Sequence, residues 1–343
     1  MKKHIRTLAY GMCLTAFTVF LSLDTFVLSS AYQENATEMN MAMFASVNAE
    51  ALSESAEETE ETSDDVETGR VSSKQKRVQS HRAQGSATGE NTIQESTVNL
   101  NSGAAVRTYQ DEDISVTLTE QTVNGTAVYV ADVRLSSAEY LKTAFADDTY
   151  GRNVTAKTSV IADAKDAILA INGDYYGARE RGWVIRNGVV YRSSADNADV
   201  LCIYADGSME VVDPATPTAQ SLVERGVWQA FSFGPALLEN GAVAVSEQDE
   251  VGRAMASNPR TAIGMIEPLH YVFVVCDGRT GESEGLSLYE LAQFLRTLGV
   301  ETAYNLDGGG SSTMVFQGEV INNPTTSGST IKERSVSDIV YIG

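Results

Sequence analysis

The run Asn305-Leu306-Asp307-Gly308-Gly309-Gly310-Ser311-Ser312 places one carboxylate, three glycines and two hydroxyls directly after an apolar segment. Glycine accepts positive φ and has no Cβ, so such a run lets the backbone approach a ligand closely and turn its N–H groups toward an anion. An isolated Asp-Gly pair is typical of a plain turn. Three glycines at the end of a predicted strand favour a ligand-binding loop, because function concentrates on loops held by a rigid scaffold.

Two other apolar segments also end in polar, glycine-containing turns. Asn172-Gly173-Asp174 follows a predicted buried strand at residues 167–171, and Asp277-Gly278-Arg279 follows one at residues 271–276. Arg260 enters a further apolar segment. Taken singly, each of these features is as typical of a turn or a surface ion pair as of a site. They predict a site only if the strand ends converge.

A converged site would combine carboxylates, arginines and a glycine loop. The catalytic candidates are Asp174, Asp277 and Asp307, and the substrate- or phosphate-binding candidates are Asn172, Arg260, Arg279, Asn305, Gly308, Gly309, Gly310, Ser311 and Ser312. Arginine forks and backbone N–H groups suit a phosphate group. Paired carboxylates suit glycosidic cleavage through an oxocarbenium-like state. The pattern requires no cofactor, but the same carboxylates could hold a hard cation such as calcium, although no EF-hand loop is present.

Several other chemistries are disfavoured by composition. The three histidines are scattered, and Ser311 and Ser312 lack a nucleophile-elbow pattern, so a Ser-His-Asp hydrolase is not indicated. A net charge of −21 and a pI near 4.5 argue against nucleic acid, which requires a clustered basic surface. Cys202 and Cys276 lie in apolar, strand-like runs, which predicts buried free thiols and no disulfide or zinc site.

The N-terminus is typical of an export element. A basic start precedes the apolar residues 8–23, and a short apolar run follows Asp24. Residues 1–32 are therefore predicted to be a signal-anchor that crosses the cell membrane once and leaves the C-terminal domain outside. Ser29-Ser30-Ala31 could be a processing site, in which case the segment is a signal peptide and the protein is secreted.

Residues 33–98 are predicted to form an acidic, disordered linker. Residues 50–67 include nine acidic side chains and no basic one, and aromatic residues are almost absent from the linker. Such a segment cannot bury enough apolar surface to offset its ordering entropy.

Residues 99–343 are predicted to form the folded domain. Asn124-Gly125, Asn187-Gly188 and Asp206-Gly207 each separate two apolar runs, which is a hairpin pattern. Helical spacing is present at residues 158–165 and 287–298, and Ser136 with Glu139 predicts a short capped helix at 136–141. Together these features predict an α+β fold with a mixed, largely antiparallel sheet and packed helices.

The order of these motifs resembles the phosphodiester glycosidase family of N-acetylglucosamine-1-phosphodiester alpha-N-acetylglucosaminidase-like proteins, in its bacterial, exopolysaccharide-related branch. The likeness covers roughly residues 155–343. It is carried by residues 171–176, 233–237, 259–264, 277–279, 285–287, 305–312 and 333–338.

The resemblance implies an α+β domain that hydrolyses a sugar-1-phosphodiester at the anomeric carbon, with an N-acetylglucosamine-type sugar. Arg260, Arg279 and the glycine loop would neutralise the phosphodiester, and Asp307 or Asp174 would stabilise the anomeric centre or activate water. Phosphate is a good leaving group, so general-acid assistance is less necessary than for ordinary glycosides. With the predicted anchor, an extracellular or cell-wall glycan is the expected substrate.

Two other classes of function fit parts of the same sequence. A non-catalytic, membrane-tethered glycan- or wall-binding module would use the same polar strand ends without turnover. A structural protein of an envelope assembly would instead expose a large apolar patch and have no polar cleft. Release of product from a sugar-phosphate diester separates the enzyme from both.

Overall fold

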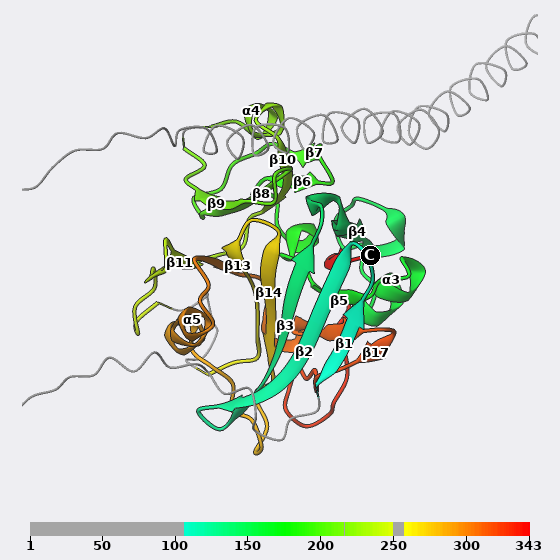
Figure 1. The fold of residues 1–343 in the computed structure, drawn as a ribbon, viewed down its shortest axis with the longest axis vertical. Helices are drawn as coiled ribbons and strands as arrows, with labels where there is room; N and C mark the ends of the chain where they lie inside the picture. The colour runs from blue at the N-terminus through cyan, green and yellow to red at the C-terminus, as the bar shows by residue number, and fades with distance from the viewer. Residues whose placement is uncertain (1–105, 216, 250–256) are drawn as a thin grey trace, which may run out of the picture.

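The computed structural model describes residues 106–215, 217–249 and 257–343 (Figure 1). The predicted anchor at 1–32 and the predicted linker at 33–98 lie outside these residues. No helix in the described part of the chain is both long enough and apolar enough to span a bilayer.

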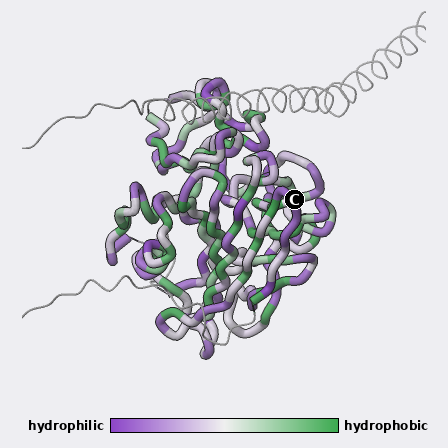
Figure 2. Tube along the Cα trace, viewed as in Figure 1, coloured by the Kyte–Doolittle hydropathy of each residue, from purple (hydrophilic) through white to green (hydrophobic). Residues whose placement is uncertain are grey.

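The largest element is an eight-stranded sheet. Its strands, in spatial order, are β1 (Arg107–Gln110), β2 (Ile114–Val123), β3 (Thr126–Leu135), β14 (His270–Cys276), β13 (Arg260–Glu267), β15 (Thr302–Asn305), β11 (Ala236–Glu239) and β12 (Ala242–Val243). Side chains of β2 alternate between buried and partly exposed over its first half, as expected for a strand with one face on the core. Figure 2 shows apolar and polar residues alternating along the strands of this sheet.

Two five-stranded sheets complete the fold. One runs β7 (Val189–Arg192), β6 (Val184–Arg186), β10 (Val227–Phe231), β8 (Val200–Tyr204) and β9 (Met209–Val212). The other runs β17 (Glu319–Val320), β16 (Met314–Phe316), β5 (Leu169–Asn172), β18 (Asp338–Ile342) and β4 (Leu141–Phe145). Every pairing between these strands and within the large sheet is antiparallel.

The main core lies between sheets. Apolar residues of β2, β3, β13 and β14 pack against those of β5, β16 and β18, which gives a sandwich of two sheets. Helix α5 (Leu288–Thr297) covers the opposite face of the large sheet, and α3 (Thr158–Ala164) covers the outer face of the β4–β5 sheet. Helix α4 (Ala219–Glu224) packs on the β6–β10 sheet, at the top of Figure 1.

The structure confirms the antiparallel sheet but contains fewer helices than an α+β fold suggests: it is mostly β-sheet with few helices. The three predicted hairpins are present as β2–β3, β6–β7 and β8–β9. The short capped helix predicted at 136–141 is present only as one turn of 3₁₀-helix. Ser137, not Ser136, caps a single turn η2 (Ala138–Tyr140), and the chain then enters β4 because Leu141 onward pairs with β18.

The remaining short turns of 3₁₀-helix are η3 (Ala146–Asp148), η4 (Tyr176–Ala178) and η5 (Gly309–Ser311). Cys202 and Cys276 are buried and free, as predicted. Burial raises the pKa of the Cys276 thiol to about 12, so it is held as the neutral thiol near pH 7.

Candidate functional site

The strand order of the large sheet explains why the predicted motifs meet. β13 lies between β14 and β15 and is antiparallel to both, so its first residues lie beside the last residues of its two neighbours. Arg260 pairs with Cys276, and Ala262 pairs with Asn305. The loops that follow β14 and β15 therefore emerge beside the start of β13.

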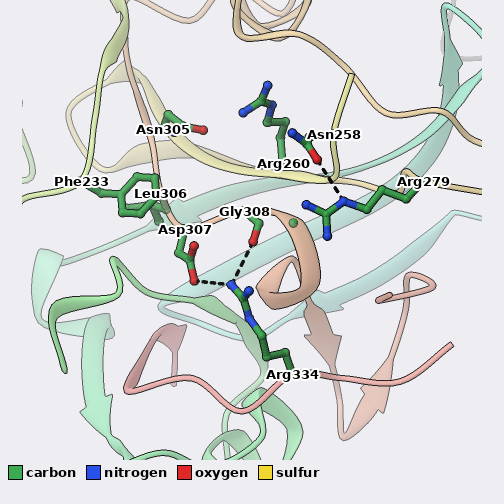
Figure 3. A pocket seen from close by; sticks show the side chains of 10 residues that line it. Phe233, Asn258, Arg260, Arg279, Asn305, Leu306, Asp307, Gly308 and Arg334 are labelled. Atoms are coloured by element: carbon green, nitrogen blue, oxygen red, sulfur yellow. Dashed lines mark hydrogen bonds and ion pairs between the residues drawn. The ribbon is translucent and has the colours of Figure 1, made fainter. Parts of the chain in front are cut away.

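A cavity of about 250 Å³ opens at this edge (Figure 3). Its wall combines polar and charged side chains from separate loops with one aromatic ring. The lining residues are Phe233, Asn258, Arg260, Arg279, Asn305, Leu306, Asp307, Gly308, Gly309 and Arg334. The convergence predicted from the strand ends is thus found for Arg260, Arg279, Asn305, Asp307, Gly308 and Gly309.

Three arginines, Arg260, Arg279 and Arg334, line the pocket. The buried Arg260 donates from Nε to the carbonyl of Leu286 at 2.9 Å. Arg279 donates from Nε to Oδ1 of Asn258 at 3.0 Å and from Nη1 to the carbonyl of Thr326 at 2.6 Å. Burial, and then the charges of Arg334 and Arg260, lower the pKa of Arg279. An anion in the pocket would relieve this like-charge repulsion.

Asp307 is the one carboxylate among the described residues that line the pocket. Its Oδ2 lies 3.0 Å from Nη2 of Arg334. Burial raises the pKa of Asp307, while the charge of Arg334 and hydrogen bonds from Ser311 and from the Gly308 amide oppose the rise. The described lining thus combines three guanidinium groups with one carboxylate, in a chain whose net charge is −21.

One amide of the predicted anion-binding nest is already used within the protein. The Gly309 amide donates to the carbonyl of Pro259 at 2.8 Å. The glycines are needed for close approach: a Cβ at position 308 would lie 2.9 Å from the Pro259 oxygen, and one at 309 would lie 2.9 Å from Nη2 of Arg279. The loop therefore shapes the pocket without presenting the Gly309 amide to a ligand.

Four further candidates, Asn172, Gly310, Ser311 and Ser312, are not in the pocket lining. Asn172 donates from Nδ2 to the Asp307 carbonyl at 2.6 Å and accepts from Thr261 Oγ1 at 2.8 Å and from the Thr313 amide at 3.2 Å. Ser311 Oγ accepts from Nη2 of Arg334 at 2.6 Å. Ser312 is fully buried. Asn172 and Ser311 thus fix Asp307 and Arg334 in place.

Asp174 also lies outside the lining. Its Oδ1 accepts from Nη2 of Arg186 at 2.9 Å, and its Oδ2 accepts from the Ser232 amide at 2.9 Å. Arg186 also binds Asp338 Oδ2 at 2.8 Å, and all three side chains are buried. Both oxygens of Asp174 thus have protein partners, and its bond to Ser232 holds the residue before Phe233.

Asp277 is likewise occupied by protein donors. Its Oδ1 accepts from the Asn323 amide at 2.8 Å and from Nδ2 of Asn322 at 3.1 Å, and its Oδ2 accepts from Nδ2 of Asn323 at 3.1 Å and from Tyr129 at 3.3 Å. Strand-end position predicted a shared edge of the sheet, but it could not predict which way each side chain points. Among the described residues, Asp174 and Asp277 therefore accept hydrogen bonds from other parts of the protein and support the structure around the pocket.

Four lining residues were not among the sequence candidates: Phe233, Asn258, Leu306 and Arg334. Phe233 and Arg334 belong to motifs that carried the family resemblance, and those motifs were the only available signal for them. Arg334 lies in a segment without regular structure, so only the fold brings it to Asp307. Across residues 106–215, 217–249 and 257–343, no three His, Cys, Asp or Glu side chains gather where they could share a metal ion.

The likeness to known proteins is clearest in the second half of the chain. The SPbeta prophage-derived protein YomE of Bacillus subtilis (strain 168) is 29% identical over 171 residues, 48% of this chain and 26% of its own length. The N-acetylglucosamine-1-phosphodiester alpha-N-acetylglucosaminidase of Mus musculus is 36% identical over 120 residues, 34% of this chain and 23% of its own. The chain spans about a quarter of the length of these curated relatives.

Solved structures support the fold alone. The zebrafish N-acetylglucosamine-1-phosphodiester alpha-N-acetylglucosaminidase catalytic domain, auto-inhibited by its pro-peptide, superposes with a TM-score of 0.54 at 19% identity, covering 70% of this chain and 87% of that one. A hypothetical protein from Synechocystis gives a TM-score of 0.54 at 16% identity, covering 69% and 63%. The family model for phosphodiester glycosidase matches residues 165–343, more than half of the chain and including every residue of the pocket lining. The chain therefore belongs to the phosphodiester glycosidase family.

Proposed function

We propose that this protein hydrolyses a sugar-1-phosphodiester at the anomeric carbon. The observation that carries the proposal is that three arginines and, among the described residues, one carboxylate line the same pocket. Guanidinium groups match the paired oxygens of a phosphodiester and make charge-assisted hydrogen bonds to them. A sugar joined to phosphate would present an anion to the arginines and its anomeric carbon to Asp307.

The pocket chemistry favours a reaction that needs one carboxylate. Ordinary glycosidases use two carboxyl groups about 5 to 9.5 Å apart, one of which protonates the leaving oxygen. Here Asp307 is the one carboxylate lining the described pocket, and the leaving group is a phosphomonoester dianion, whose conjugate acid has a pKa of about 6, so it departs without strong general-acid help. Asp307 would attack the anomeric carbon or activate water there, and Arg334 would help to keep it ionised. Arg260 and Arg279 would stabilise the departing phosphate.

The sugar is proposed to be of the N-acetylglucosamine type, as in the names of the mouse and human relatives. The substrate is proposed to be an extracellular or cell-envelope glycan, because a basic start and an apolar run open the sequence. Membrane attachment through that segment is part of the same proposal.

A panel of sugar-1-phosphodiesters incubated with the full chain, with and without a chelator, tests the proposal. Free sugar and a phosphomonoester are the expected products. Loss of turnover with the chelator would add a cation such as calcium to the mechanism. Saturable binding without any product would instead support the glycan-binding module and overturn the enzyme.

Removing the Arg279 guanidinium should weaken the phosphate half of the pocket. Arg279→Ala is expected to lower kcat/KM for the diester about 10- to 100-fold, because a hydrogen bond to a charged group contributes about 1.5–3 kcal/mol. It should also weaken inhibition by inorganic phosphate. Arg225→Ala is the matched control, because Arg225 is exposed and pairs with Glu210 away from the pocket. Equal effects of the two substitutions would contradict the assignment.

A methyl group at position 309 should disturb Arg279 through sterics. Gly309 has φ +60, and its Cβ would meet Arg279. Gly309→Ala is therefore expected to lower kcat/KM about tenfold, in addition to about 1–2 kcal/mol of backbone strain. Gly318→Ala is the control, since Gly318 has φ +81 with nothing within 4 Å of its Cβ. Steady-state kinetics and melting curves of both variants separate the two effects: the control should lose stability and keep activity.

A further inference from the structure

Asn305 presents an unused acceptor to the pocket. It is 1% exposed, lies at the end of β15 and belongs to the pocket lining. Among the residues that the structure describes, its Oδ1 has no hydrogen-bond partner. Figure 3 shows the oxygen end of this side chain pointing toward the space beside Arg260.

The orientation of the amide is fixed by its other end. Nδ2 of Asn305 donates to the Gly234 carbonyl at 2.8 Å, and the backbone amide of the same residue donates to the Pro235 carbonyl at 3.2 Å. Turning the side-chain amide over would bring two oxygens together at Gly234. The nitrogen therefore stays with Gly234, and the oxygen stays in the pocket.

A phosphodiester cannot satisfy this oxygen. A buried acceptor without a donor is destabilising, and a phosphodiester anion offers only acceptors. A sugar offers hydroxyl donors, and an acetamido group offers an N–H. We propose that Asn305 Oδ1 accepts a hydrogen bond from a donor on the sugar ring, so that Asn305 determines sugar specificity and is not a phosphate ligand. This inference rests on the proposed function of the pocket.

The rest of the lining agrees with a pocket of two halves. Phe233, Leu306 and Asn305 lie together on one side of Figure 3, and Arg279 lies on the other. The Phe233 ring can pack against the C–H face of a sugar. The Arg179 guanidinium lies 4.7 Å from the centre of that ring and donates to the Ser232 carbonyl at 3.1 Å, which holds the ring in place. The sugar would thus contact Phe233 and Asn305, and the phosphate would contact Arg279.

Single-position deoxy analogues of the sugar, each as a 1-phosphodiester, test this assignment on the unmodified protein. The analogue that lacks the hydrogen-bond donor for Asn305 Oδ1 should have a kcat/KM about 10- to 100-fold lower than that of the parent sugar. In Asn305→Ala, the kcat/KM values of that analogue and of the parent sugar should agree within threefold. The kcat/KM of every other analogue, relative to the parent sugar, should be the same as in the unmodified protein. Two results would overturn the proposal. One is that the kcat/KM of each analogue relative to the parent sugar is identical in the two proteins, and the other is that the unmodified protein turns over all analogues equally.

Inhibition by inorganic phosphate provides the second readout. Asn305→Ala should leave the inhibition constant for phosphate within about threefold of the original, whereas Arg279→Ala should raise it. A loss of phosphate affinity in Asn305→Ala equal to that in Arg279→Ala would make Asn305 a phosphate ligand and overturn the inference. If the unmodified protein released no product from any parent diester, the proposed function itself would fail, which is a different result. Because the analogue panel uses the unmodified protein, poor folding of the variant does not remove the test.

Discussion

Asp307→Asn is expected to lower kcat/KM for a sugar-1-phosphodiester by about 10³-fold. Asparagine keeps the shape of the side chain but can neither attack carbon nor take a proton from water, and such positioned groups contribute about 10²–10⁴-fold. No other carboxylate in the described lining could replace it. Steady-state kinetics on a purified diester measure the loss, with Asp213→Asn as a control at an exposed carboxylate.

Phosphate binding should change in the opposite direction. Removing the negative charge of Asp307 from among three arginines should strengthen inhibition by inorganic phosphate while turnover is lost. This combination distinguishes a chemical role from a collapsed pocket. Activity of Asp307→Asn within threefold of the original protein would exclude Asp307 from the chemistry.

The second large effect concerns stability. Arg186→Met is expected to lower the free energy of unfolding by about 3–5 kcal/mol, because it leaves buried carboxylates without their counter-ion. Arg186 is buried and pairs with Asp174 at 2.9 Å and with Asp338 at 2.8 Å. Urea denaturation at pH 7 measures the loss, and Arg225→Met at an exposed ion pair is the control. A loss below about 1 kcal/mol, the range of a surface pair, would contradict this account.

The pH dependence of that loss has a defined sign. Burial raises the pKa of Asp338 in the folded protein, the charge of Arg186 opposes the rise, and Asp174 adds to it. The folded state therefore holds more protons than the unfolded state above the ordinary carboxyl pKa of about 4, and stability falls as pH rises from there to the raised pKa. Without Arg186 the pKa of Asp338 should rise further. Arg186→Met should therefore lower the free energy of unfolding more at pH 7 than at pH 5. Adding Asp174→Asn and Asp338→Asn should recover part of the loss, because no buried charge then remains unpaired.

The sequence predicted where the strands end, because that signal is local: an apolar run followed by a polar glycine turn identifies a buried strand and its end. Their meeting depends on strand order, since β14 and β15 flank β13 and run antiparallel to it, so both end at the edge where β13 begins. Arg260, Arg279 and Asp307 meet for this reason. The hairpins were predictable in the same way, since Asn-Gly and Asp-Gly supply the positive φ that tight turns require.

The supporting side chains could not be predicted from local pattern. Whether Asp174 faces the pocket or Arg186 depends on its partners in β6 and β18, and Asp338 is far away in the sequence. The Gly309 amide faces Pro259 because of how the loop packs against the start of β13. Arg334 reaches Asp307 from a segment with no periodic signal. Each of these contacts is set by tertiary packing, which no single segment encodes.

Hydrolysis in ¹⁸O-labelled water tests the central claim most directly, because it reports which bond breaks. A sugar-1-phosphodiester should be converted by the full chain to free sugar and phosphomonoester, and mass spectrometry should find the label on the anomeric hydroxyl of the sugar. The phosphomonoester should carry none. Label in the phosphate would mean cleavage at phosphorus, and the assignment of Asp307 to the anomeric centre would then be wrong.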